Sequence, residues 1–117
     1  MDLYHSMTVQ VPIETRHGVH TVPVSSIIMV EAQGKKVIVH TTARDYESIH
    51  TMQYWLDQLP VNRFFQTHRS FIINYEHITD FDHMLVHLSN GQFTAYLTKR
   101  KYSAFKGAYL LYLESTR

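Results

Sequence analysis

The sequence contains no cysteine, which removes disulfide bonds, thiolate nucleophiles and the commonest ligands of structural zinc sites. It has only four glycines, and they are too scattered to form a glycine-rich loop that cradles a phosphate. No apolar run approaches the roughly 20 residues that a membrane-spanning helix needs. The formal net charge is only +1, far from the strongly basic balance that identifies a nucleic-acid binder by composition. Composition therefore excludes several kinds of site without indicating a function.

The chain is long enough for one folded unit, and we expect a single domain over residues 1–117. Apolar residues make up 44% of the sequence, which is sufficient for one core. The stretch from Met1 to Gln10 lacks the basic region and the apolar segment of a secretory signal. We therefore expect a cytoplasmic protein.

Most of the chain has the periodicity of short β-strands. Polar and apolar side chains alternate over Thr8–Ile13, as they do in a half-buried strand. Two apolar runs, Ile27–Val30 and Val37–Val39, flank a polar turn. The pair Asn90 and Gly91 suits a tight hairpin because both residues tolerate positive φ. These patterns predict an antiparallel β-fold with short connections.

Two segments instead have helical periodicity. Thr51 can cap the first and Pro60 ends it; its apolar residues are Met52, Trp55, Leu56 and Leu59. Thr98 can cap the second, whose apolar residues are Tyr102, Phe105, Tyr109 and Leu113. The expected fold class is therefore mostly β with short helices.

Catalytic groups are scarce. His68 and Ser70 are the nearest approach to a nucleophile with its base, but no third group and no strained G-x-S-x-G turn accompanies them. We therefore predict that the protein is not an enzyme and needs no cofactor.

The nine histidines raise the question of a metal site. His17 and His20 flank a glycine turn, and His83 and His87 straddle the start of a strand, but no carboxylate stands at ligand spacing. We predict no metal site and keep a histidine-based one as a weaker alternative.

Basic residues concentrate in three segments beside turns: Lys35–Lys36, Arg69 and Lys99–Lys101. Arginine can make a bidentate contact to guanine in the major groove, and lysine can neutralise phosphates. The alternative for Arg69 is a structural ion pair with Asp45 or Glu47, and sequence spacing does not choose between the two. Together the segments indicate a surface that faces DNA.

At this point the sequence resembles a known family. The stretch Phe64–Asn74 closely resembles the signature of LytTR-type DNA-binding domains. The likeness extends upstream to Ile27–Ala32 and downstream to Thr98–Tyr102, which resembles the Ser-Arg-Arg stretch before that family's last helix. It covers nearly the whole chain, from about Val9 to Leu113.

The resemblance implies an elongated, LytTR-like fold of mostly antiparallel strands, in which loops rather than a recognition helix enter successive major grooves. The residues that it assigns to base contacts are Arg69, Arg100 and Lys35. Those assigned to phosphates are Lys36, Lys99 and Lys101, while the residues expected to organise a loop are His68 and Ser70. The aromatic and aliphatic residues expected in the core are Phe64, Phe65, Phe71, Ile73 and Trp55.

The resemblance also implies the partners. These are double-stranded DNA, bound by two copies at half-sites about one helical turn (roughly 34 Å) apart, and a phosphorylatable receiver domain in cis; we expect no membrane partner. We therefore predict a bacterial transcription regulator of a two-component system. The alternative is a β-rich module that binds a protein or peptide through an exposed strand edge and has no affinity for DNA.

Overall fold

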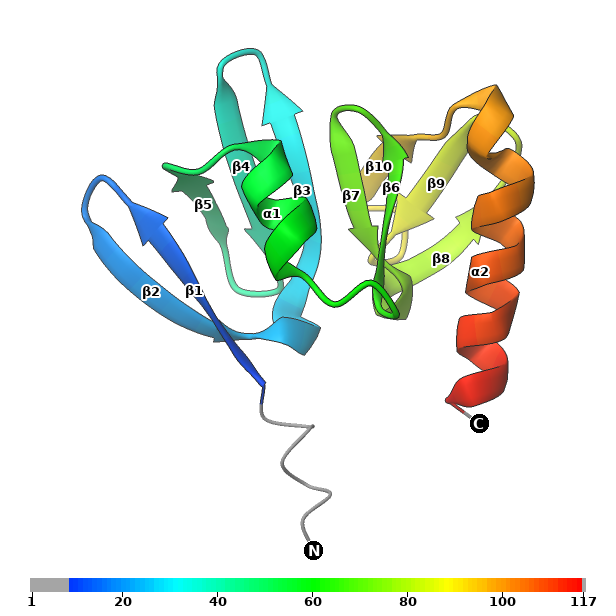
Figure 1. Cartoon of the computed structure of the whole chain (residues 1–117), viewed down its shortest axis with the longest axis horizontal. Helices are drawn as coiled ribbons and strands as arrows, with labels where there is room; N and C mark the ends of the chain where they lie inside the picture. Colours follow the sequence, from blue (N-terminus) through cyan, green and yellow to red (C-terminus); the bar gives the residue numbers. More distant parts are fainter. Residues whose placement is uncertain (1–8, 117) are drawn as a thin grey trace, which may run out of the picture.

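The computed structural model describes residues 9–116, which form short antiparallel strands and two α-helices (Figure 1). The strands are β1 (Gln10–Thr15), β2 (Gly18–Pro23), β3 (Ile27–Gln33), β4 (Lys36–Thr41), β5 (Asp45–Ser48), β6 (Phe64–His68), β7 (Phe71–Asn74), β8 (Ile78–Phe81), β9 (Leu85–Leu88) and β10 (Phe93–Tyr96). The helices are α1 (Met52–Gln58) and α2 (Tyr102–Ser115). The predicted mostly-β class is confirmed, although Thr8 of the first predicted strand lies outside the described residues.

Strand β3 is the centre of a five-stranded sheet with the order β5-β4-β3-β7-β6. It pairs antiparallel with β4 and with β7, so that Met29 lies opposite His40 on one side and opposite Ile73 on the other. Because both faces of these central strands are covered, their sequences are continuous apolar runs instead of alternating ones.

Each face of this sheet carries its own hydrophobic cluster. Successive residues of β3 and β7 point to opposite faces, so Val30 and Ile72 join the first cluster while Met29 and Ile73 join the second. The β1–β2 ribbon and α1 complete the first cluster; the three-stranded sheet β10-β9-β8 and α2 complete the second. The residues predicted for the core belong to these clusters, with Phe65 half-buried at the edge of the second.

Helix α1 begins and ends where the sequence predicts. The Thr51 hydroxyl oxygen accepts a hydrogen bond from the backbone N–H of Tyr54 at 3.1 Å, which satisfies one of the free donors of the first turn. Trp55 is fully buried, and its indole N–H donates to Ser48 Oγ at 3.0 Å. The helix is thereby fastened to the end of β5.

The prediction that Thr98 caps the last helix is wrong. A 3-10 turn, Lys99–Lys101, separates Thr98 from α2, and the Thr98 side chain makes no capping hydrogen bond. Its Oγ1 is buried, without a hydrogen-bond partner within residues 9–116. The backbone N–H of Thr98 instead donates to the carbonyl oxygen of Thr67 at 3.0 Å. This contact matters for the arrangement of the basic segments.

Within the described part of the chain, neither helix has the length and apolar character required to span a bilayer.

Candidate nucleic-acid interface

The three basic segments lie along one edge of the molecule, the upper edge in Figure 1. The β3–β4 turn carries Lys35. The β6–β7 turn lies beside it, because the backbone N–H of Ala32 donates to the Ser70 carbonyl oxygen at 2.9 Å. The segment after β10 lies next along the edge, because Thr98 bonds to Thr67 at the end of β6. Backbone hydrogen bonds therefore align segments that are about 30 residues apart in sequence.

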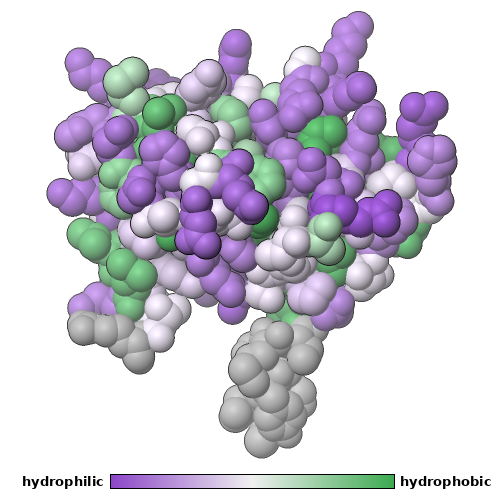
Figure 2. Space-filling view, turned by 180° about the vertical axis from the view of Figure 1, so that it is seen from behind, coloured by the Kyte–Doolittle hydropathy of each residue, from purple (hydrophilic) through white to green (hydrophobic). Residues whose placement is uncertain are grey.

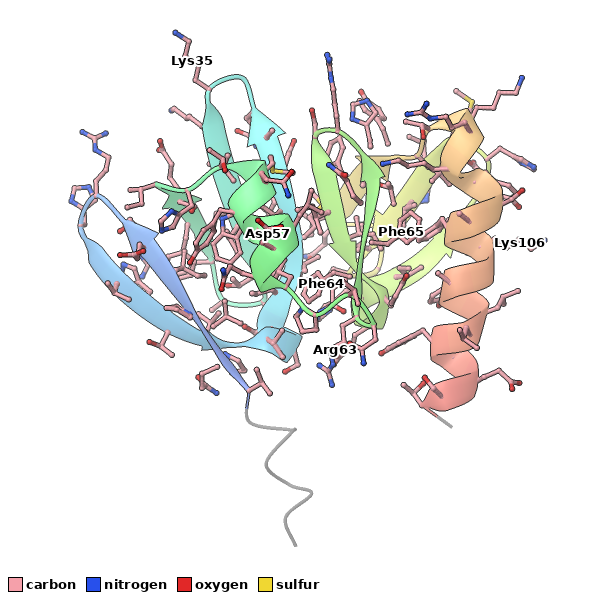
Figure 3. All side chains as sticks on the ribbon, viewed as in Figure 1. Lys35, Asp57, Arg63, Phe64, Phe65 and Lys106 are labelled. Carbon is pink, nitrogen blue, oxygen red and sulfur yellow. The ribbon has the colours of Figure 1, made fainter. Side chains whose placement is uncertain are left out.

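The cations of this edge are accessible. The exposed ones are Lys35, Lys36, Arg69, Lys99 and Arg100, and no ion pair within residues 9–116 involves any of them. Figure 3 shows Lys35 projecting beyond its turn, and Figure 2 shows hydrophilic side chains along the same edge seen from behind. The edge thus presents positive charge to solvent, where a polyanion can reach it.

Two of the carboxylates on the central sheet, Glu31 and Asp45, are held by one histidine. Both ring nitrogens of His40 lie 2.8 Å from a carboxylate oxygen, Nε2 from Glu31 and Nδ1 from Asp45. Among the described residues, Arg69 forms no ion pair with Asp45 or Glu47, so the structural alternative for Arg69 finds no support. These two carboxylates are therefore engaged with His40 and not with the cations of the turns.

Asp82 is an anionic side chain at the end of the edge, in the β8–β9 turn. Its carboxylate accepts hydrogen bonds from the backbone N–H groups of Met84 and Leu85, at 2.8 and 2.9 Å. These two bonds, of which the one from Met84 has the larger effect, lower the pKa of Asp82 because they stabilise the charged form. The carboxylate therefore serves to fix its own turn.

The β6–β7 turn is braced from inside. The backbone N–H of Ser70 donates to Nδ1 of His68 at 3.0 Å, across the position of Arg69. The His68 ring lies 5.9 Å from the ring of Phe71 and 5.8 Å from that of Tyr96, both at steep angles. Arg69 is therefore carried on a turn whose backbone is fixed on both sides.

Lys101 differs from its two basic neighbours. Its ammonium group is half-buried and donates to the Gln66 carbonyl oxygen at 3.0 Å. Burial, and then the neighbouring charge of Arg100, lower the pKa of Lys101 because both disfavour its charged form. This side chain ties the segment after β10 to β6.

Within residues 9–116, no three side chains among His, Asp and Glu gather where they could hold a metal ion. An apolar hollow of about 600 Å³ lies beside the basic edge and is lined by His83, Met84, Tyr96, Leu97 and Lys99. Its lining is mostly apolar and includes one imidazole, of His83, and one ammonium group, of Lys99.

Comparison with known proteins agrees with this geometry. The model of the LytTr DNA-binding domain family matches residues 17–109. The chain belongs to this family. The LytTr DNA-binding domain of a Bacillus cereus protein has a similar structure, with a TM-score of 0.71 and 28% sequence identity over 85% of this chain and 94% of that one.

Two curated relatives are longer. The sensory transduction protein LytR of Staphylococcus epidermidis is 31% identical over 72 residues, which are 62% of this chain and 29% of LytR. The transcriptional regulatory protein NatR of Bacillus subtilis is 28% identical over 109 residues, 89% of this chain and 47% of NatR. The chain spans less than half the length of either relative.

The LytTr-type signature contains contacts that sequence reasoning did not find. Gln66 and Thr67 precede the turn residues, and their carbonyl oxygens hold the segment after β10. Backbone acceptors of this kind leave no signal in residue type. A second omission is the β1–β2 turn with Arg16 and His17: the sequence indicates a glycine turn there, but it gives no reason to group this turn with the basic edge.

Proposed function

We propose that this LytTr domain is the DNA-reading part of a bacterial response regulator that controls transcription, without catalytic activity of its own. The observation that carries the proposal is a row of three aligned segments with five exposed cations that form no ion pair within residues 9–116. The residues proposed for base contacts are Arg69, Arg100 and Lys35. Those proposed for phosphates are Lys36, Lys99 and Lys101.

A row of turns can read DNA without a recognition helix. The major groove is about 12 Å wide and admits a two-stranded β-ribbon as well as a helix. Arg69 stands on such a ribbon, and the bond from Thr98 to Thr67 holds the segment of Arg100 beside it. A fixed separation between the two backbone segments suits contacts to two different base pairs, because only the arginine side chains, and not the turns, have to be ordered on binding.

Lys101 can serve both the protein and the DNA. One N–H of the ammonium group donates to the Gln66 carbonyl oxygen, which leaves two N–H donors for a phosphate oxygen. His68 and Ser70 in turn are proposed to organise the turn of Arg69 through the bond between them.

Few phosphate contacts per copy imply weak binding by one copy. Sequence-independent affinity of this kind is about 10⁻⁴ to 10⁻⁶ M at physiological salt. We therefore propose that residues 1–117 act as one domain and that two copies bind half-sites roughly 34 Å apart. A receiver domain in the same protein, within the cytoplasm, would control how the copies meet.

The test begins with selection from a random duplex library, followed by titration of the enriched and a scrambled duplex at several salt concentrations. Arg69→Ala and Arg100→Ala should each weaken binding by about 1 to 3 kcal/mol and relax the preference at one base pair. Lys106→Ala, on the outward side of α2 in Figure 3, is the matched control and should change neither quantity.

If an arginine variant loses the same binding free energy on the enriched and the scrambled duplex, that arginine contacts a phosphate and not a base. Absence of binding to any duplex would refute the proposal and favour a protein- or peptide-binding module instead.

A further inference from the structure

The β1–β2 turn is a fourth cationic tip with a defined conformation. The Thr15 hydroxyl donates to the Gly18 carbonyl oxygen and accepts from the backbone N–H of His17, both at 3.1 Å. Gly18 has φ of +129°, a conformation that side-chain-bearing residues rarely adopt. Arg16 and His17 between them are exposed. The guanidinium of Arg16 is therefore presented on a fixed turn, as that of Arg69 is.

Backbone pairing places this tip level with the basic edge. The backbone N–H of Ile49 donates to the Glu14 carbonyl oxygen at 3.0 Å, and Ser48 lies opposite Val37, next to the β3–β4 turn. The β1–β2 ribbon therefore ends on the same side as Lys35. Figure 1 shows the tip pointing to that side, at the opposite end of the long axis from α2.

The hollow beside the tip has more basic than acidic side chains. Arg16, His17 and His20 border a hollow of about 350 Å³ together with Arg44, whose guanidinium lies 5.1 Å from the ring centre of Tyr46. Of the two carboxylates that line this hollow, Asp45 is engaged with His40, and Glu47 is exposed. Arg16 forms no ion pair within residues 9–116.

The dimensions of the molecule say which part of the DNA this tip can meet. The longest dimension is 44 Å, whereas one turn of duplex is about 34 Å long. A duplex that lies along the basic edge is therefore covered over one full turn and a further length of roughly three base pairs, at about 3.4 Å each. The β1–β2 tip stands at the end of that length, beyond the three turns that face the central grooves.

We propose that the β1–β2 turn is a fourth DNA-contacting element, in which Arg16 donates to a phosphate of the duplex flanking the base sequence read by the other turns. The contact is to the backbone, so it adds affinity and orientation without base preference. This inference rests on the proposed DNA-reading function and extends its footprint on one side.

The test uses the full chain with an enriched duplex carrying long flanks, and with two shorter duplexes, each trimmed on one side. Arg16→Ala should weaken binding to the long duplex by the same factor for every base sequence, and should reduce the slope of log K against log[salt] by about 0.9. Removal of the flank on the side of the β1–β2 turn should weaken binding by the wild type by the same factor. It should leave the affinity of Arg16→Ala unchanged. Arg16→Lys should keep the slope, since it keeps the charge.

Lys106→Ala is again the control for a general loss of charge and should follow the wild type on all three duplexes. The inference is overturned if Arg16→Ala and the wild type bind the long duplex with the same affinity, or if trimming reduces the affinity of both by the same factor. In either case Arg69→Ala must still weaken binding. Failure of the wild type to bind any duplex would instead refute the underlying DNA-reading function.

Discussion

Replacement of Phe105 by alanine should remove the main contact between α2 and the rest of the molecule. Phe105 is fully buried. Its ring centre lies 5.0 Å from that of Phe81 on β8 and 5.4 Å from that of Phe65 on β6, both nearly edge-to-face. Because α2 directly follows the segment of Arg100, its anchoring also fixes one end of the basic edge.

The expected cost can be worked from these contacts. Burial of an aromatic side chain contributes about 1.5 to 3 kcal/mol, and each well-placed ring pair adds about 0.5 to 1.5 kcal/mol. Two pairs and the cavity left behind give a loss of about 4 kcal/mol for Phe105→Ala, within the range of such substitutions. Total stabilities are typically about 5 to 15 kcal/mol, so the variant should fold but be marginal.

Urea and thermal unfolding followed by circular dichroism would measure this loss, and the midpoint temperature should fall by about 15 °C. Leu111→Ala is the matched control, because Leu111 lies on the same helix but is 70% exposed. Its stability should change by less than about 0.5 kcal/mol. A loss below about 1 kcal/mol for Phe105→Ala, or equal losses for both variants, would refute the view that Phe105 anchors α2.

Three further predictions concern single residues. Lys101→Met should lower the midpoint of thermal unfolding while Lys99→Met leaves it unchanged, because only the Lys101 ammonium bonds to the protein; equal midpoints would contradict this. Burial raises the pKa of Tyr75 to about 12, above its ordinary value near 10, so the stability that its neutral phenol contributes is complete below pH 10 and is lost as pH rises towards 12. Urea titrations across this range should show the loss in the wild type and a smaller one in Tyr75→Phe. Two glycine-to-alanine changes should alter the free energy of unfolding in opposite directions. Gly107→Ala should stabilise α2 by about 0.5 to 1 kcal/mol, whereas Gly34→Ala should destabilise the protein by about 1 kcal/mol because the φ of Gly34 is +63°. Changes in the same direction would disprove the reasoning.

Local patterns predict the local elements of this fold. Helix α1 follows from Thr51 and Pro60, and the β9–β10 turn from Asn90 and Gly91, where positive φ is required and found. The short strand β5 is less evident, because Asp45–Ser48 carries mostly polar side chains and gains its pairing from β4. A strand at a sheet edge takes its conformation from its neighbour as much as from its own residues.

Thr98 shows the limit of such patterns for the site. Its residue type suits a helix cap, but its hydroxyl points into the interior and its backbone N–H binds Thr67. That contact spans two segments far apart in the sequence, and it depends on the position of β6 beside β7 and of β10 near β6. Sequence reasoning proposes which residues bind DNA, whereas only the strand order shows that their turns share one edge.

Strand order also explains how a chain with a net charge of only +1 can present a cationic surface. Because β3 and β7 are antiparallel neighbours, with Glu31 opposite Phe71, the turn after β3 and the turn before β7 must lie at the same edge. The β9–β10 turn, residues 89–92, lies at the other edge and carries no charge, and the β4–β5 turn beside it carries one cation, Arg44. Four of the carboxylates in residues 9–116 are paired with histidines, as Asp80 is with His87. The distribution of charge over alternate turns, more than its sum, therefore decides what such a domain attracts.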